Sequence, residues 1–269
     1  MESAVERAIT FITERYSEPL SLSDVANSAI LSRFHFCRIF RDATGVTPGR
    51  FLSAVRIYQA KRMLATTAMN VTEVAFAVGY NSLGSFSNHF TDSVGISPGR
   101  FRRIARTGGF EPADWEVPQQ GIPVTGTITL PPGYACGRVY LGAFDTPIIQ
   151  RQPAAAVIVD LPAEAAEAAV EGAPGAEFSY LLPAVPHGRW FLRAVAVADN
   201  TAPEPWTRRV LLIGGAGPLS IPAAASSRVK ISLRPRQPTD LPILLALPDL
   251  EPRPGLSAEA EIEVPARAG

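Results

Sequence analysis

The 269-residue chain carries 25 basic and 25 acidic residues, so its formal net charge is zero. With 46% apolar and 19% charged residues, it can fold around one large core or two ordinary ones. No apolar run approaches about 18 residues, which excludes a transmembrane helix, and the first residues lack the apolar stretch of a secretory signal. Two cysteines cannot build a disulfide framework or a zinc site, so we expect a cytoplasmic protein.

Prolines divide the chain into two parts. Three of the 25 prolines lie in residues 1–107, and the other 22 lie in residues 108–269. Because proline disrupts helix interiors, the first part can be helical and the second cannot contain much helix. The glycines and prolines that follow Thr107 predict a linker over 108–120 and a second domain over 121–269.

Charge divides at the same place. Residues 1–107 hold 13 basic and 8 acidic residues, a net charge of +5, whereas residues 108–269 hold 12 and 17, a net charge of −5. A net charge of zero would argue against nucleic acid as a partner, but here it is the sum of two opposed parts. The basic first part is therefore compatible with nucleic-acid binding.

The first part contains an internal repeat with an offset of fifty residues. Residues 32–51 read SRFHFCRIFRDATGVTPGRF, and residues 82–101 read SLGSFSNHFTDSVGISPGRF. In each unit a short helix, which begins near Leu22 or Val71, precedes a turn and a second helix over about 32–43 or 82–92. Within the second helices, Phe36, Ile39 and Phe40, and then Phe86 and Phe90, are predicted to face the core.

A long helix is predicted between the two units. Thr47 is a suitable cap and Pro48 a suitable first residue, and the helical pattern continues to about Thr66. About 18 residues at 1.5 Å each span roughly 27 Å. That length would hold the two second helices roughly one DNA turn apart, on one face of a duplex.

The repeat belongs to a longer pattern of apolar, glycine and proline positions. It includes the run from Ala26 to Pro48, the spacing Arg56-x-x-x-Ala60-x-x-x-Leu64, and the run from Val74 through Gly79-Tyr80 to Phe101-Arg102. Over residues 5–106 this pattern resembles the DNA-binding region of AraC/XylS-family transcription regulators. The resemblance implies seven helices and binding to consecutive major grooves of double-stranded DNA. The order departs from the usual family arrangement, in which the DNA-binding region follows a sensor domain.

The resemblance places base contacts on the outward face of each second helix. The corresponding positions here are Phe34, Cys37, Arg38, Leu83, Gly84, Ser85 and Asn88. Arg38 can grip guanine and Asn88 can grip adenine, each through two hydrogen bonds. Phe34 is predicted either to contact a thymine methyl group or to pack against the preceding helix. Because Leu83 and Gly84 have no polar side chain, the second unit is expected to read shape or methyl groups.

Basic side chains near these helices are candidates for neutralising DNA phosphates. They are Arg33, Arg41, Arg50, Lys61, Arg100, Arg102 and Arg103. At each position a solvated surface charge is the alternative. His35 and His89 are interpreted as structural histidines rather than as ligands.

The second part alternates apolar and polar residues with the period of β-strands. Strands are predicted at 124–130, 138–144, 155–161, 177–182, 189–198, 207–213, 228–234, 242–247 and 259–264, with a helix or loop at 163–171. Short strands separated by proline and glycine turns favour an antiparallel sandwich. Glutamates on the last strand and basic residues on strand 228–234 predict that these two strands share a sheet.

The segment from Phe178 to Leu192 resembles carboxypeptidase-regulatory or transthyretin-like sandwiches. The similarity lies in Gly188, which precedes the aromatic pair Trp190 and Phe191. It implies a hairpin closed at the glycine, and it implies a fold rather than a function.

The second part contains no nucleophile elbow, phosphate loop or metal-ligand spacing, so we predict no enzyme activity and no cofactor. The chain is predicted to be multidomain, with an all-α double helix-turn-helix domain followed by an all-β sandwich. We expect a promoter-binding regulator, with RNA polymerase as a further partner, whose sandwich binds a small effector or a protein. The alternative is an interaction or ligand-binding module that a weakly specific helix-turn-helix domain tethers to DNA. The opposed charges add the hypothesis that the acidic domain folds over the basic one and restrains DNA binding.

Overall fold

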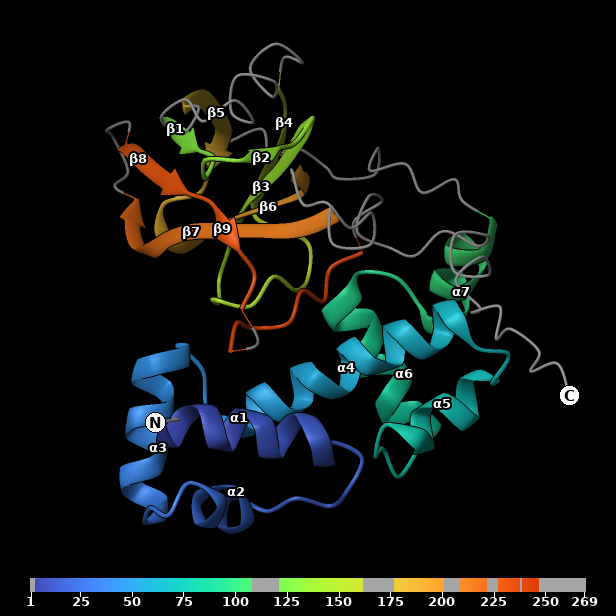
Figure 1. Cartoon of the computed structure of the whole chain (residues 1–269). Coiled ribbons are helices and arrows are strands. Elements are labelled where there is room, and N and C mark those ends of the chain that lie inside the picture. Colours follow the sequence, from blue (N-terminus) through green and yellow to red (C-terminus); the bar gives the residue numbers. More distant parts are fainter. Residues whose placement is uncertain are drawn as a thin grey trace, which may run out of the picture.

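The computed structural model describes residues 3–107, 121–161, 177–200, 209–221, 227–237 and 239–246. Figure 1 shows a helical part, with a β part lying above it in this view. The predicted fold class is confirmed, since helices are followed by packed β-sheets. The predicted linker over 108–120, the segment 163–171 and the strand 259–264 with its sheet partnership lie outside the described residues.

Seven helices occur among the described residues of the first part. They are α1 Ala4–Arg15, α2 Leu22–Ser28, α3 Arg33–Thr44, α4 Pro48–Thr66, α5 Val71–Ala77, α6 Leu83–Val94 and α7 Pro98–Thr107. The pairs α2–α3 and α5–α6 are the two predicted helix-turn-helix units, and α4 runs between them (Figure 1). No helix in the described part of the chain is long and apolar enough to cross a membrane.

Local sequence determines where these helices begin and end. Ser21 and Asn70 cap the first helix of each unit with a reciprocal capping box, which satisfies two backbone donors. Thr47 caps α4 as predicted. Gly45 and Gly95 end α3 and α6 with φ of 77° and 90°, a left-handed conformation that glycine adopts without steric cost.

The same aromatic cluster is built twice in the helical core. Ring centroids of neighbouring phenylalanines lie 5.3 to 5.7 Å apart, and each of these side chains is almost fully buried. The members are Phe36, Phe40 and Phe51 in the first unit and Phe86, Phe90 and Phe101 in the second. Ile39 remains partly exposed, so its predicted core position is only partly met.

The β part consists of two sheets that pack face to face. Its strands are β1 Ile122–Thr129, β2 Tyr134–Ala135, β3 Arg138–Phe144, β4 Ala155–Asp160, β5 Glu177–Val185, β6 Gly188–Asn200, β7 Arg209–Ile221, β8 Ser227–Ser232 and β9 Arg234–Pro235. One sheet has the order β5-β1-β8; the other has the order β4-β3-β6-β7-β9, with β2 beside β6. Val124 and Ile231 of the smaller sheet share an apolar core with Leu141, Ala194 and Leu212 of the larger.

Three details of the β part differ from prediction. Strands β1 and β8 pair in parallel, so the smaller sheet is mixed. The predicted hairpin at Gly188 is wrong, because β5 pairs with β1 whereas β6 pairs with β3 and β7, and the turn therefore passes between the sheets. The predicted strand at 242–247 is also wrong, since Ile243 makes just an isolated bridge to Ile149. Leu244 and Ala246 are buried in the helical core, whereas Ile243 and Leu245 are buried against the larger sheet without joining it as a strand.

Two segments of the β part reach down to the helices, and we name them the docking segments, 145–151 and 241–246 (Figure 1). Ile148 and Leu244, one from each segment, are buried in the same cluster as the helical core. The backbone amide of Arg151 donates to a carbonyl in the last turn of α6 at 2.8 Å. The helical core is therefore completed by residues from the second part of the chain.

Candidate nucleic-acid interface

The outward face of α3 exposes the predicted base contacts of the first unit. Phe34 is 89% exposed, which excludes the alternative that it packs against the preceding helix. Arg38 is exposed one turn further along, and Cys37 is partly exposed between them. The Arg38 Nη2 atom lies 3.3 Å from Nδ1 of His35. The face thus presents a cation, an aromatic ring and a thiol.

The outward face of α6 is exposed as well, but its side chains are short. Leu83 is 40% exposed, and Gly84, Ser85 and Asn88 are exposed beside it. The Ser82 hydroxyl accepts from the Ser85 backbone amide at 3.2 Å and donates to the Ser85 hydroxyl at 3.0 Å. A Cβ atom on Gly84 would meet nothing within 4 Å. Because these side chains are short, a partner can approach the backbone of α6 closely.

The predicted phosphate contacts fall into three groups. The exposed arginines are Arg33, Arg41, Arg50, Arg100 and Arg103. Arg102 donates to the carbonyl of Met69, and burial lowers the pKa of its guanidinium, so this side chain ties α7 to the loop before α5. The predicted phosphate contact of Lys61 is wrong, because Lys61 is 6% exposed and its Nζ donates to the Leu245 carbonyl at 3.1 Å.

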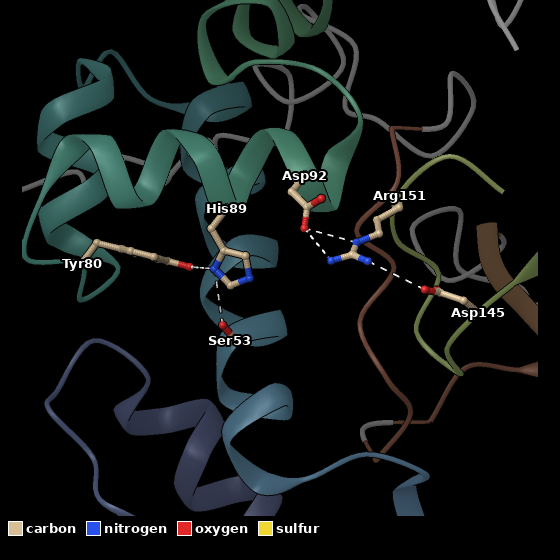
Figure 2. Close-up of polar contacts among 6 residues, drawn as sticks. All are labelled: Ser53, Tyr80, His89, Asp92, Asp145 and Arg151. Carbon is tan, nitrogen blue, oxygen red and sulfur yellow. Dashed lines mark hydrogen bonds and ion pairs between the residues drawn. The ribbon is translucent and has the colours of Figure 1, made fainter.

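His89 has the predicted structural position, on the side of α6 that faces α4. The Tyr80 hydroxyl lies 2.6 Å from the Nδ1 atom of His89 and the Ser53 hydroxyl, from α4, lies 3.5 Å from the same atom (Figure 2). Burial lowers the pKa of His89, and the nearby carboxylate of Asp92 opposes that shift. The ring therefore joins α6 to α4 and to the turn between α5 and α6.

The first docking segment contacts the C-terminal ends of both second helices. Asp92 of α6 accepts hydrogen bonds from the Arg151 guanidinium at 2.8 and 3.2 Å, and Arg151 also lies 3.7 Å from Asp145 (Figure 2). At the end of α3, a Cβ atom on Gly45 would lie 3.1 Å from the ring of Pro147. One short segment of the β part thus spans the ends of α3 and α6.

This docking leaves the predicted base contacts uncovered. The docking segments meet the C-terminal ends of α3 and α6 and the side of α4, whereas Phe34, Arg38 and Asn88 lie on the outward faces and stay exposed with the β part in place. Among the described residues, the β part therefore does not cover this face. The hypothesis that the acidic part folds over it stays a prediction, because 12 of the 17 acidic residues in 108–269 lie outside the described residues.

Sequence reasoning missed the junction residues. Lys61 follows Ile57 by four residues and precedes Leu64 by three, so its helical position on a buried face was a usable signal of burial. No comparable signal places Arg151 beside Asp92, since 59 residues separate them in sequence.

Comparison with known proteins agrees with this geometry. A helix-turn-helix domain family model matches residues 25–104. The lactose operon transcription activator of Staphylococcus xylosus is 30% identical over 98 residues, which cover 36% of this chain and 35% of that protein. The transcriptional activator AarP of Providencia stuartii is 30% identical over 106 residues, which cover 39% of this chain and 78% of AarP. The chain belongs to the AraC/XylS family of helix-turn-helix transcription regulators.

Other AraC/XylS relatives match over a similar length. The melibiose operon regulatory protein of Escherichia coli is 28% identical over 102 residues, 38% of this chain and 34% of that protein. The solved DNA-binding domain of AdpA, in complex with a target DNA, is 31% identical, covers 38% of this chain and 92% of that chain, and has a TM-score of 0.37. The chain spans about a third of the length of the two operon regulators. The family model ends within α7, so it does not extend into the β part.

Proposed function

We propose that this AraC/XylS-family chain is a sequence-specific transcription regulator that inserts α3 and α6 into consecutive major grooves of promoter DNA. The observation that carries the proposal is the duplicated exposed face on helices that share one core. The 19 residues of α4 span roughly 28 Å, which suits two helices about one DNA turn apart.

The exposed side chains suggest a division of labour on the duplex. We assign guanine readout to Arg38 and adenine readout to Asn88, while Phe34 meets a thymine methyl group. The exposed arginines near these helices neutralise phosphates, which accounts for the basic character of residues 1–107. Arg102 is already bonded to Met69, so we do not assign it a phosphate.

We also propose that the β part modulates DNA binding as a brace. The first docking segment contacts both Gly45, at the end of α3, and Asp92, near the end of α6. A rigid body that touches both ends restrains how far apart and at what angle the two helices present themselves. We propose two domains, 1–107 and 121–269, in which residues 241–246 of the second domain help to complete the helical core of the first.

The main test is fluorescence anisotropy of the full chain with DNA from promoters recovered by genome-wide binding. We expect nanomolar affinity that falls steeply with salt, and much weaker binding to random DNA of equal length. Equal affinity for random DNA would contradict sequence specificity and favour the alternative in which DNA is merely a tether.

The two cysteines provide an independent test within one molecule. Cys37 is partly exposed among the proposed base contacts, whereas Cys136 is 4% exposed in the β core, where burial raises the pKa of its thiol to about 11. Because the thiolate is the reactive form, iodoacetamide should label Cys37 much faster than Cys136. Promoter DNA should slow labelling of Cys37 and leave Cys136 unchanged; unprotected Cys37 in a formed complex would contradict the proposed contact face.

A further inference from the structure

A cavity lies between the C-terminal end of α3 and the β part. Its volume is about 330 Å³, within the lower range of small-molecule sites. Ala43 and Thr44 of α3 line one wall, and Arg193 of β6 with Gly214 and Gly215 of β7 line the opposite wall. The cavity therefore borders both the proposed DNA-reading unit and the larger sheet.

Arg193 is a partly buried cation on the wall of this cavity. Its Nε donates to the Pro147 carbonyl at 2.9 Å, its Nη1 donates to the Leu192 carbonyl at 3.3 Å, and the guanidinium lies 5.4 Å from the centre of the Phe191 ring. Burial lowers the pKa of Arg193, and no carboxylate in the described part of the chain pairs with it. A desolvated guanidinium without a carboxylate partner is uncommon in proteins.

The other charged groups that line the cavity neutralise each other. Arg234 and Asp240 form an ion pair with nitrogen–oxygen distances of 2.5 and 2.7 Å, and the backbone amide of Gln237 also donates to Asp240. Among the described lining residues, Arg193 is therefore the cation whose charge no neighbouring carboxylate balances. The Nη2 atom of Arg193 makes no hydrogen bond with the described residues. This end of the guanidinium can therefore donate hydrogen bonds to a ligand.

We propose that this cavity binds a small hydroxycarboxylate whose carboxylate pairs with Arg193, and this rests on the proposed regulatory function. A guanidinium fork matches the planar geometry of a carboxylate. The opposite wall is the C-terminal end of α3, where backbone carbonyls carry partial negative charge and favour hydrogen-bond donors. A ligand with a carboxylate at one end and hydroxyl groups at the other satisfies both walls.

The ligand is coupled to the first DNA-reading unit through one residue. Pro147 accepts the hydrogen bond from Arg193, and its ring lies against Gly45, which ends α3. A ligand that bridges Arg193 and α3 stabilises the docked arrangement, in which Phe34 and Arg38 are exposed. Since a ligand favours the state that it binds, promoter affinity should rise with ligand.

The test is calorimetric titration of the full chain, without DNA, using malate, tartrate and citrate at constant ionic strength set with chloride. We expect at least one of these acids to bind, and the matching uncharged amide to bind at least about tenfold more weakly. Arg193→Gln should lose binding by about tenfold or more. Arg189→Gln, the same change at an exposed position of the same strand, should bind like the wild-type chain.

The inference is overturned if none of the three acids binds at millimolar concentration, if acid and amide bind equally, or if Arg193→Gln binds as tightly as wild type. The comparison of acid with amide uses the wild-type chain, so it remains decisive even if Arg193→Gln does not fold. A chain that binds its promoter but none of the acids contradicts this inference alone. A chain that binds an acid but shows no preference for promoter DNA contradicts the proposed function instead, and retains the site.

Discussion

The two helix-turn-helix units share one scaffold but present different surfaces. Inward positions are repeated, as Phe36 and Phe86 show, whereas outward positions differ at nearly every step. At the offset of fifty residues, Phe34 corresponds to Gly84 and Arg38 to Asn88. Two further pairs complete the contrast, Arg33 with Leu83 and Arg41 with Thr91.

We propose from this difference that the two units contact DNA in different ways. The first unit reaches outward with long and charged side chains, which suit base readout and phosphate contact. The second offers short neutral groups, which suit close approach of the backbone and recognition of groove shape. A requirement for stability would keep the core the same in both units, and a separate requirement for specificity would make their surfaces differ.

The largest expected effect comes from removing Arg38, the proposed base-reading cation of the first unit. Arg38→Ala should weaken promoter binding by about 1–3 kcal/mol and relax specificity at the base it reads. Asn88→Ala, at the equivalent position, should cost about 1 kcal/mol, because a neutral amide makes weaker hydrogen bonds than a guanidinium. Anisotropy against a set of single-base variants of the promoter measures both. Equal losses of binding free energy in the two variants would contradict the proposed difference between the units.

A second prediction uses Gly84, the counterpart of Phe34. Because a Cβ there meets nothing within 4 Å, Gly84→Ala should raise the free energy of unfolding by about 0.5–1 kcal/mol. The added methyl group should nevertheless weaken DNA binding if α6 approaches the duplex closely. Urea unfolding and anisotropy measure the two effects separately. Gly99→Ala, also without neighbours within 4 Å, is the matched control for stability.

A third prediction concerns the two equivalent aspartates of α3 and α6. Asp92 pairs with Arg151 of the first docking segment, whereas Asp42 is exposed on α3. Both partners of the pair are about half exposed, at 53% and 48%, so Asp92→Ala should lower the free energy of unfolding by just about 0.2–1 kcal/mol. Asp42→Ala should change it less. A double-mutant cycle of Asp92→Ala and Arg151→Ala measures the coupling energy between the two side chains. A coupling energy near zero would contradict a stabilising ion pair.

The smallest effect is expected from His89, which replaces Ile39 of the first unit. Burial lowers the pKa of His89 below its ordinary value of 6.5, so the unfolded chain takes up the proton at a higher pH than the folded chain. Above pH 6.5 the ring is neutral in both states and contributes no pH dependence. Below it, the free energy of unfolding falls until the pH reaches the lowered folded-state pKa.

Urea unfolding at several pH values on either side of 6.5 tests this prediction. His89→Gln should flatten the decline between pH 6.5 and the lowered pKa. His187→Gln, at an exposed turn of the β part, should leave the decline as in the wild-type chain. If the two variants show the same profile, the decline comes from other groups.

The helical part could be predicted from sequence because its determinants are local. Capping residues such as Ser21, glycines such as Gly45 and the repeated phenylalanines act within a few residues of their own position. The exposure of the outward positions follows from helical periodicity alone. The helices predicted for the second unit are confirmed as well, since the same local pattern occurs there.

The docking of the two parts could not be predicted, because it depends on contacts between distant residues. The segment 242–247 is a short apolar run of strand length, and nothing local shows that Leu244 and Ala246 join a helical core. The hairpin prediction at Gly188 failed for a related reason, since sheet membership depends on which distant strands β5 and β6 pair with. The cavity beside Arg193 exists because of this docking and was therefore invisible in the sequence.

The return of residues 241–246 to the helical core also has a consequence during protein synthesis. The ribosome completes α7 long before it makes this segment, and at ordinary elongation rates the delay is roughly 10–30 s. Until then the Lys61 ammonium lacks the Leu245 carbonyl, and the apolar surface that Leu244 covers is open to solvent or to chaperones. A nascent or prematurely terminated chain thus carries a double helix-turn-helix region that is incompletely packed. We expect quality-control proteases to cleave such a chain faster than the finished one, because its apolar core is incompletely covered.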